Sequence, residues 1–348
     1  MSISRNGHLG RSSNMCLRGG ASALAVALCV FVSDFPAAAA GKIIRISIPG
    51  SDMTVAYGIN DAGSITGGYG SASGAVHGFV RASDGTITTF DPPGAAVTYG
   101  LVINRKGVIG GYWYDNSGSV GHGFLRTVQG QFKTFDPEGS IDTEPYGIND
   151  TGTMAGYYED ANYVMHGFVR ERDGAITTFD PKGSAGTQPL GINAAGTISG
   201  YYKDASNAYH GFIRAADGTI TRFQVSGSST LVWGINDSGT VVGSNIDGTT
   251  GLSHGFVRTA DGTITRFDVS GTVSTQPNII NAKGTIAGGY LDSKGYRYGF
   301  GRSAAGKITS FQVGKSAQTE TWGINKDSAV VGLYFVGAHT IHAFLRTP

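Results

Sequence analysis

The chain has 348 residues, of which 56 are glycine, and only 15% are charged, with a formal net charge of +1. This near-neutral balance excludes the strongly basic surface that binds nucleic acids or anionic membranes. Abundant glycine with few charges favours short strands joined by tight turns over helices.

The first 40 residues have the pattern of a secretory signal peptide. Arginines precede an apolar run over residues 21–32, and a series of alanines ends at Ala40. This order is typical of a segment that is cleaved on export, here between Ala40 and Gly41. The apolar run is short for a bilayer span, although a retained anchor remains the alternative. We expect a secreted or periplasmic mature protein, residues 41–348, without a membrane span.

Removal of this segment changes the composition of what remains. Both cysteines, Cys16 and Cys29, lie in it, so the mature chain has no thiol, no disulfide and no cysteine-ligated metal. It also takes away three of the 26 basic residues and one of the 25 acidic ones, which leaves 23 and 24, a net charge of −1. We expect a monomer that is stabilised by packing alone and that uses no cofactor.

Three landmarks return about every 44 residues in the mature chain, and they define repeats 1 to 7. An Ile-Asn pair ends at Asn60, Asn104, Asn149, Asn193, Asn236, Asn281 and Asn325. A glycine follows at Gly67, Gly110, Gly156, Gly200, Gly243, Gly288 and Gly332. A Phe-x-Arg triplet ends at Arg81, Arg126, Arg170, Arg214, Arg258, Arg302 and Arg346. This period is that of four-stranded propeller blades.

Four strands can be read in the first repeat, at residues 54–60, 64–69, 76–81 and 86–91. Both faces of each strand carry apolar or small residues, as a sheet packed between two neighbouring sheets requires. We therefore predict an all-β protein whose residues 41–348 form a single seven-bladed β-propeller domain.

The phase of the repeats predicts how the ring closes. The mature chain opens with a segment, residues 43–48, that aligns with a fourth strand and places Ile46 where repeat 1 has Phe90. The chain ends on a third strand, HAFLRTP, so the first segment supplies the strand that the last repeat lacks. An open solenoid would need capping repeats, and the sequence has none.

The hairpin between the third and fourth strands predicts polar pairs. Its register sets a histidine opposite an aspartate in four repeats, at His77/Asp91, His122/Asp136, His166/Asp180 and His254/Asp268. The other pairs are His210/Gln224, Tyr298/Gln312 and His342/Ser47. Because these pairs are spread around a ring, we interpret them as structural hydrogen bonds that allow polar groups to be buried between blades. We expect the repeated asparagines to cap turns and the repeated arginines to bond to carbonyls of the next blade.

The repeat resembles a known family. The pattern Ile-Asn-x-x-Gly-x-x-x-Gly, followed by His-(Gly/Ala)-Phe-(Leu/Val)-Arg, is similar to the HAF-type extracellular repeat family, and the last repeat contains His-Ala-Phe itself at 342–344. The resemblance covers the whole mature chain. It implies an exported bacterial β-propeller and brings no catalytic residues with it.

Residues that differ between repeats are candidates for function. A tyrosine two places after the glycine landmark is mostly structural; it occurs in every repeat except repeat 5, which has Asn245. Aromatic and acidic residues in the second-to-third loops and before the inner strands, the repeated tyrosines of repeats 3 and 4 among them, suit sugar recognition, because rings cover C–H surfaces and carboxylates accept hydrogen bonds from hydroxyls. The candidates are Trp113, Tyr114, Asp115, Tyr158, Tyr202, Asp204, Trp233 and Trp322.

The sequence predicts a binding module for carbohydrate or cell-envelope ligands and leaves two alternatives open. The first is a scaffold that meets another protein through the same face. The second is a channel-site lyase or hydrolase that uses His339, in the last second-to-third loop, with an acid from another blade, although no nucleophile–base motif is present and we expect no enzyme. Calcium at the recurring loop aspartates is a weaker interpretation than Asx turns, so we predict no metal site.

Overall fold

The computed structural model describes residues 41–348 except 71–73, 228, 315–317 and 338–339. The predicted signal peptide therefore lies outside the described residues. Those that are described form 28 strands and no helix. Among them, accordingly, no helix could span a membrane.

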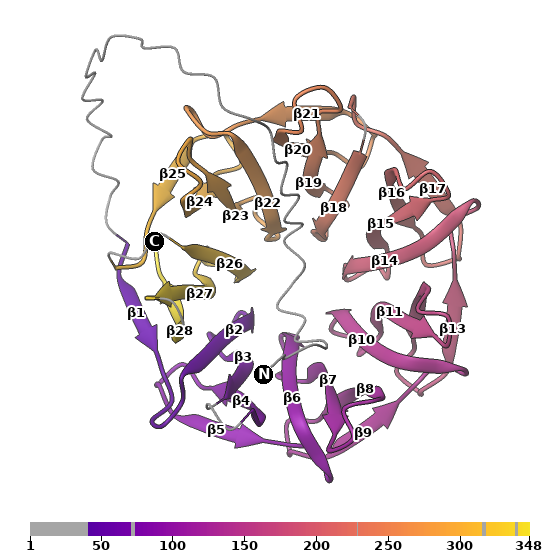
Figure 1. Cartoon of the computed structure of the whole chain (residues 1–348), viewed down its shortest axis with the longest axis vertical. Coiled ribbons are helices and arrows are strands. Elements are labelled where there is room, and N and C mark those ends of the chain that lie inside the picture. Colours follow the sequence, from indigo (N-terminus) through magenta and orange to yellow (C-terminus); the bar gives the residue numbers. More distant parts are fainter. Residues whose placement is uncertain (1–40, 71–73, 228, 315–317, 338–339) are drawn as a thin grey trace, which may run out of the picture. The chain divides into compact units, whose positions relative to one another are not determined.

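The strands form four-stranded antiparallel sheets arranged in a ring, with the first strand of each repeat innermost (Figure 1). These inner strands are β2 (Met53–Ile59), β6 (Ala95–Ile103), β10 (Ser140–Ile148), β14 (Ser184–Ile192), β18 (Ser229–Ile235), β22 (Ser274–Ile280) and β26 (Thr319–Ile324). The second strands are β3 (Ile65–Gly70), β7 (Ile109–Asp115), β11 (Met154–Asp160), β15 (Ile198–Asp204), β19 (Val241–Ile246), β23 (Ile286–Leu291) and β27 (Val330–Val336).

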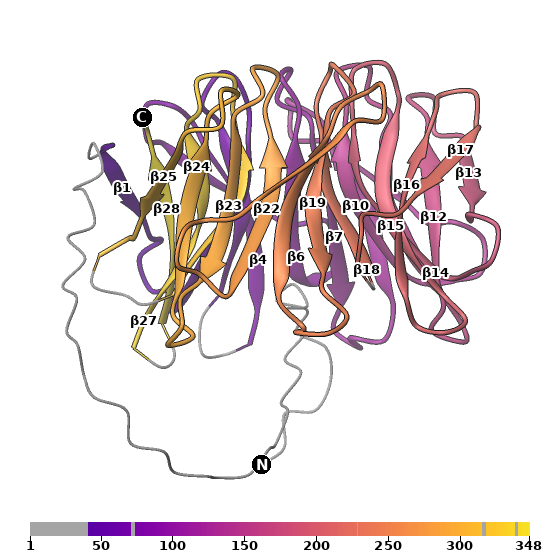
Figure 2. The same cartoon turned by 90° about the horizontal axis from the view of Figure 1, so that it is seen from above.

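The third strands carry the Phe-x-Arg triplets. They are β4 (Val76–Arg81), β8 (Gly121–Arg126), β12 (Met165–Arg170), β16 (Tyr209–Arg214), β20 (Ser253–Arg258), β24 (Arg297–Arg302) and β28 (Thr340–Arg346). The outermost strands are β5 (Ile87–Phe90), β9 (Phe132–Phe135), β13 (Ile176–Phe179), β17 (Ile220–Phe223), β21 (Ile264–Phe267), β25 (Ile308–Phe311) and β1 (Ile43–Ile46). The strands run between two opposite faces of the ring, and the connecting loops lie on those faces (Figure 2).

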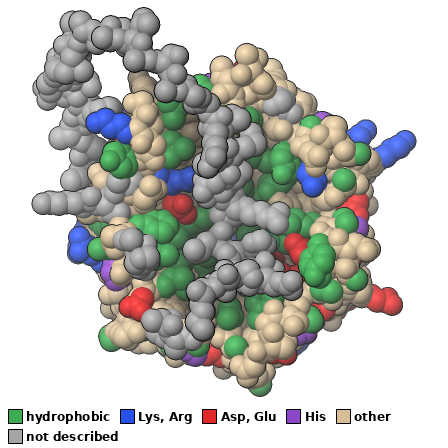
Figure 3. All heavy atoms as spheres, in the orientation of Figure 1, with side chains coloured by type: hydrophobic (Ala, Val, Ile, Leu, Met, Phe, Trp, Pro, Cys, Tyr) green, Lys and Arg blue, Asp and Glu red, His purple; other side chains and the backbone are tan. Residues whose placement is uncertain are grey.

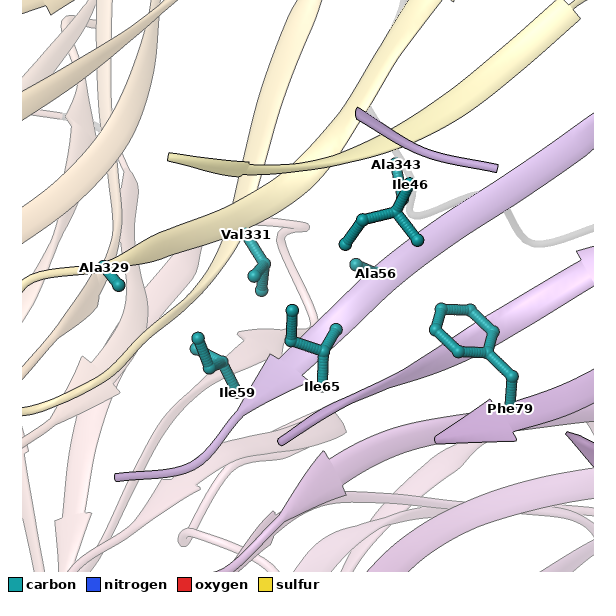
Figure 4. Close-up of a cluster of buried hydrophobic side chains, with 8 residues drawn as sticks. All are labelled: Ile46, Ala56, Ile59, Ile65, Phe79, Ala329, Val331 and Ala343. Atoms are coloured by element: carbon teal, nitrogen blue, oxygen red, sulfur yellow. The ribbon is translucent and has the colours of Figure 1, made fainter. Parts of the chain in front are cut away.

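The first strand of the chain pairs with the last. β1 runs antiparallel to β28, with Ile43 opposite Arg346 and Ile46 opposite Ala343, which confirms the predicted pairing over a slightly shorter strand. Ile46 is buried in a cluster with Ala56, Ile65 and Phe79 of repeat 1 (Figure 4). The N-terminal strand therefore joins the two ends of the chain through both hydrogen bonds and apolar packing.

The core lies between neighbouring sheets and is built from the same residues in each repeat. The phenylalanine of every third strand is fully buried, and from repeat 2 onward it meets the fourth-strand phenylalanine of the preceding repeat edge to face, as in Phe90–Phe124 at 6.1 Å. Gly78 makes room for this ring, because a Cβ there would lie 2.2 Å from Phe90. The predicted register of the hairpin, with Gly78 opposite Phe90, is confirmed.

The repeated arginines have a different role from the one predicted. From repeat 2 to repeat 7 each guanidinium lies 4.7–4.9 Å from the centre of the fourth-strand phenylalanine of the preceding repeat. Nη1 donates a hydrogen bond to the carbonyl of the residue that directly follows the arginine in the sequence, as from Arg214 to Ala215 at 3.3 Å. The expectation of a carbonyl in the next blade is wrong, because the guanidinium reaches its neighbour through a ring face instead.

The repeated asparagines cap turns, as predicted, and also connect the repeats. Asn60 Oδ1 accepts hydrogen bonds from the backbone N–H groups of residues 62 and 64. Its Nδ2 donates a hydrogen bond to the carbonyl of Asn104 at 3.1 Å. The same side-chain bond runs from every repeat to the next at 2.9–3.5 Å and returns from Asn325 to the carbonyl of Asn60. The bonds form one circle around the ring axis.

Candidate functional site

The repeated histidines are held by partners in their own sheets. Nδ1 lies 2.7–2.9 Å from a carboxylate oxygen in each of the four predicted pairs: His77/Asp91, His122/Asp136, His166/Asp180 and His254/Asp268. In the same way, His210 Nδ1 lies 2.9 Å from Gln224 Oε1. The hairpin register therefore predicted the hydrogen-bond partner of these five histidines correctly.

The expectation that these pairs are buried between blades is wrong. Each aspartate directly follows the last residue of a fourth strand, and 30–46% of its side chain is exposed: Asp91 after β5, Asp136 after β9, Asp180 after β13 and Asp268 after β21. The fourth strand is the outermost one and ends at its phenylalanine, so the carboxylate beyond it lies at the rim of the sheet. Exposed pairs of this kind contribute little to stability.

The pair predicted for the last repeat does not form. His342 lies on β28, and its buried Nδ1 has no hydrogen-bond partner among the described residues. The predicted bond to Ser47 is wrong, although β1 pairs with β28 in the same register as the fourth strands of the other repeats.

Three of the predicted ligand-binding aromatics contact the repeated histidines. Trp113, Tyr158 and Tyr202 each lie over the histidine of their own repeat, with ring centres 4.7–5.2 Å apart. Each also packs into a different hydrophobic cluster between sheets. The structure does not bring these three side chains together.

Trp113 stands at the position that holds the repeated tyrosine in every other repeat except repeat 5. Gly111, not Gly110, pairs with the third-strand phenylalanine, as Gly67 and Gly156 do in their repeats. The landmark in repeat 2 was therefore misplaced by one residue, because two glycines stand side by side there. The constant spacing of seven residues from Asn104 identifies Gly111.

The predicted loop aspartates hold their own turns. Asp115 Oδ1 accepts from the backbone and hydroxyl of Ser117. Asp204 Oδ1 accepts from Ser206 and Ala208, and its Oδ2 lies 2.8 Å from His210 Nε2. These hydrogen bonds hold the pKa of Asp204 well below its usual value. Within the described ranges, no group of three or more acidic, histidine or cysteine residues could hold a metal ion.

The remaining aromatic candidates belong to the inner part of the ring. Trp322 on β26 lies 6.0 Å from Tyr57 on β2, and Tyr57 lies 6.1 Å from Tyr99 on β6. Tyr112 and then Tyr114 continue this row, with ring centres 5.3 and 5.8 Å apart. Trp233 lies in a second group, 5.8 Å from Tyr201.

The aromatic row ends at acidic residues of β10. The Tyr114 hydroxyl donates to Asp142 Oδ2 at 2.6 Å, and the Tyr146 hydroxyl donates to Glu144 Oε2 at 2.7 Å. Tyr146 in turn stacks on Tyr157. We call the whole set the inner cluster: Tyr57, Tyr99, Tyr112, Tyr114, Asp142, Glu144, Tyr146, Tyr157, Glu320 and Trp322.

Glu144 is a strongly perturbed acid of the inner cluster. It is only 1% exposed, and its Oε1 has no hydrogen-bond partner in the described part of the chain. Burial, followed by the nearby Asp142, raises its pKa to about 8. Burial also raises the pKa of Glu320, against the opposite effect of Arg297, whose Nε lies 3.8 Å from Glu320 Oε1.

Sequence reasoning missed Glu144 and Glu320, although a signal was present. Five places before the repeated asparagine stand Val55, Tyr99, Glu144, Gln188, Leu231, Gln276 and Glu320. The residue just before this position is a fully buried threonine in every repeat. A variable position beside an invariant one, on the innermost strand, is where repeats can differ without loss of the fold.

The other ends of the inner strands enclose a cavity of about 190 Å³. The Ile-Asn pairs of repeats 1 to 3 line it, together with charged residues that include Asp61, Arg105 and Asp150. Arg105 forms an ion pair with Asp150, and Asp61 accepts from the backbone of Lys326 at 2.8 Å. Carboxylates in this cavity thus have partners in neighbouring repeats, unlike Glu144 Oε1. His339, the residue of the enzyme alternative, lies outside the described residues.

Hydrophobic side chains gather around the middle of the face shown in Figure 3, with acidic and basic side chains among them. No protein-family model matches the chain, and no curated protein matches it. Solved structures do resemble it at low sequence identity, and the resemblance concerns the fold alone.

An oligogalacturonate lyase in complex with manganese is 9% identical, with a TM-score of 0.57 over 88% of this chain and 98% of that one. A prolyl endopeptidase is 9% identical, with a TM-score of 0.63 over 86% of this chain and 51% of that one. TolB from Acinetobacter baumannii is 11% identical, with a TM-score of 0.50 over 74% of this chain and 62% of that one. The chain thus spans only about half to three fifths of the last two. Together with the ring of four-stranded sheets, these similarities define a β-propeller.

Proposed function

We propose that the protein is an exported seven-bladed β-propeller of the HAF-type repeat family that binds carbohydrate or cell-envelope ligands through its inner cluster. The blade number is supported by the circle of asparagine bonds, which passes once through each repeat. The sequence of residues 41–348 has no His-Glu-x-x-His motif and no cysteine, which supports binding over catalysis.

The observation that carries the ligand class is the continuous aromatic row that leads to buried acids. The row from Trp322 through Tyr57 and Tyr99 offers apolar ring faces, and Asp142 and Glu144 supply acceptors beside it. Sugar rings present C–H faces next to hydroxyl donors, so one ligand can satisfy both kinds of group.

A glycan-binding screen on the mature protein tests the proposal. We expect one or more oligosaccharides to bind, and we expect Trp322→Ala to weaken that binding by about tenfold or more. Tyr163→Ala is the matched control, because Tyr163 is an aromatic residue that lies 71% exposed in a loop. Loss of binding in the Tyr163 variant alone would show that the ligand binds to the loops and not to the inner cluster.

A protein partner is the second candidate, and a specific observation favours it. Of eight exposed large hydrophobic residues in the described part of the chain, five lie in or beside second-to-third loops: Val120, Tyr163, Leu252, Tyr296 and Val336. These loops share one face of the ring. If the protein captures a partner from envelope extracts, if this capture is lost when these residues are substituted, and if no glycan binds in the screen, the protein-binding function is favoured instead.

A further inference from the structure

We propose that the inner cluster selects ligands with a positively charged amine, and within the carbohydrate class this means sugars with free amino groups. The inference rests on the proposed function and narrows it to a ligand chemistry. It is carried by three features of the molecule: the distribution of charge between the faces, the buried acceptor of Glu144, and the aromatic faces beside it.

The two faces of the ring differ in charge, although the mature chain is nearly neutral. The second-to-third loops of repeats 2 to 6 each carry an aspartate, at Asp115, Asp160, Asp204, Asp247 and Asp292. The fourth strands end on the same face and lead to the exposed aspartates of the His/Asp pairs. The repeated arginines stand at the ends of the third strands, on the opposite face. A cation approaching the loop face therefore meets an acidic rim.

Glu144 lacks the partner that a buried carboxylate needs. Its Oε2 accepts from Tyr146, but no basic side chain among the described residues forms an ion pair with it, and Oε1 accepts no hydrogen bond there. The other buried glutamate of the inner cluster, Glu320, has Arg297 beside it. A buried carboxylate without a cation is costly, so Glu144 holds a proton in the absence of ligand. An ammonium group placed at Oε1 would take the place of that proton and pair with the carboxylate.

The rings beside these acids suit the same cation. Glu144 and Glu320 both act on the Tyr57 hydroxyl and help to raise its pKa above the usual value, after the larger effect of burial. Tyr57 lies between Tyr99 and Trp322. Trp322 stands two residues after Glu320 on β26, and the Tyr146 hydroxyl donates to Glu144. An ammonium can donate three hydrogen bonds and is attracted to aromatic faces. An N-acetyl group at the same atom of a sugar brings one N–H donor and no charge.

Two matched oligosaccharides test this inference by isothermal titration calorimetry. The probes are a β-1,4-linked glucosamine tetramer and the same tetramer fully N-acetylated. We expect the free-amine form to bind about tenfold more tightly or better, because a hydrogen bond to a charged group is stronger than a neutral one. Glu144→Gln should bring the two affinities to within about twofold of each other, while Tyr163→Ala keeps the preference.

The outcomes separate the two proposals. Equal binding of both tetramers overturns the amine preference and leaves a carbohydrate-binding function in place. Binding of neither tetramer, nor of any glycan in the screen, overturns both, and binding of oligolysine alone replaces the sugar by a basic peptide. A preference that persists in a folded Glu144→Gln variant excludes Glu144 as its source. Glu320→Gln provides the second variant if Glu144→Gln does not fold.

Discussion

The outer hairpins and the innermost strands of the same repeats are built on different rules. In the outer hairpins, phenylalanine, arginine and phenylalanine recur from repeat to repeat, and each sheet contacts its neighbour through the same geometry. On the innermost strands, a constant buried threonine is followed by a residue that ranges from Val55 to Glu144. The difference shows that inter-sheet packing maintains the ring, while the inner surface is free to vary.

Deletion of residues 43–48 is the strongest way to test what maintains the ring. Without β1, the β28 edge is unpaired and the cluster around Ile46 loses its cover. We expect cooperative thermal unfolding, followed by circular dichroism, to be abolished or shifted to much lower temperature. Deletion of residues 1–40 should leave the transition unchanged. An unaltered melting curve after removal of 43–48 would contradict the closure.

Truncation of a side chain in the outer hairpins should mainly lower stability, whereas truncation in the inner cluster should mainly weaken ligand binding. Phe212→Ala should lower the free energy of unfolding by about 3–5 kcal/mol, because Phe212 is fully buried against Phe179. Trp322→Ala should cost less stability, since Trp322 is only partly buried, but should weaken ligand binding. Urea unfolding and glycan titration measure the two effects. Equal losses of stability would remove the distinction between the regions.

The smallest expected effect concerns the dependence of stability on pH. The pKa of Glu144 is raised to about 8 in the folded protein, so the folded state holds a proton that the unfolded chain releases at lower pH. This proton contributes stability that is full below the unfolded pKa of about 4.3 and is lost as pH rises through about 8. The groups that act on Glu144 are Asp142, Glu159 and the hydroxyls of Tyr146 and Tyr157.

Glu144→Gln removes this titration and should flatten the decline of stability between pH 5 and pH 8 by about 3–4 kcal/mol. Urea unfolding at each pH measures it. Glu138→Gln, on the crossover before β10, is a control for a change of one acid. A decline of the same slope in wild type and in the Glu144 variant would show that Glu144 is ionised in the folded state.

The parts of the fold that could be predicted are those with local or periodic causes. The Gly78–Phe90 register follows from the hairpin turn, and the pairing of β1 follows from the phase of the repeats. The arginines were misassigned because a ring and a carbonyl in a neighbouring sheet are equally consistent with the sequence pattern. Trp113 was placed in a ligand site because the adjacent glycines, Gly110 and Gly111, obscured its equivalence to the repeated tyrosines.

For the His/Asp pairs, a correct register predicts the hydrogen-bond partner but not whether the pair is buried. The hairpin turn sets His77 beside Asp91, and the hydrogen bond forms there. The same pattern does not tell whether the next sheet covers the pair, because burial depends on where the outermost strand ends relative to its neighbour. The strand ends at Phe90, so Asp91 is left in contact with water.

What the sequence alone determined was the repeat, its strands and the joining of its ends, because these depend on neighbours within a hairpin and on a period of about 44 residues. Only the tertiary structure decided which side chains meet across repeats. Trp322, Tyr57 and Tyr99 come from repeats 7, 1 and 2, and the bond from Asn325 to Asn60 spans 265 residues. Such contacts follow from the curvature that brings the inner strands around one axis, which no local pattern records.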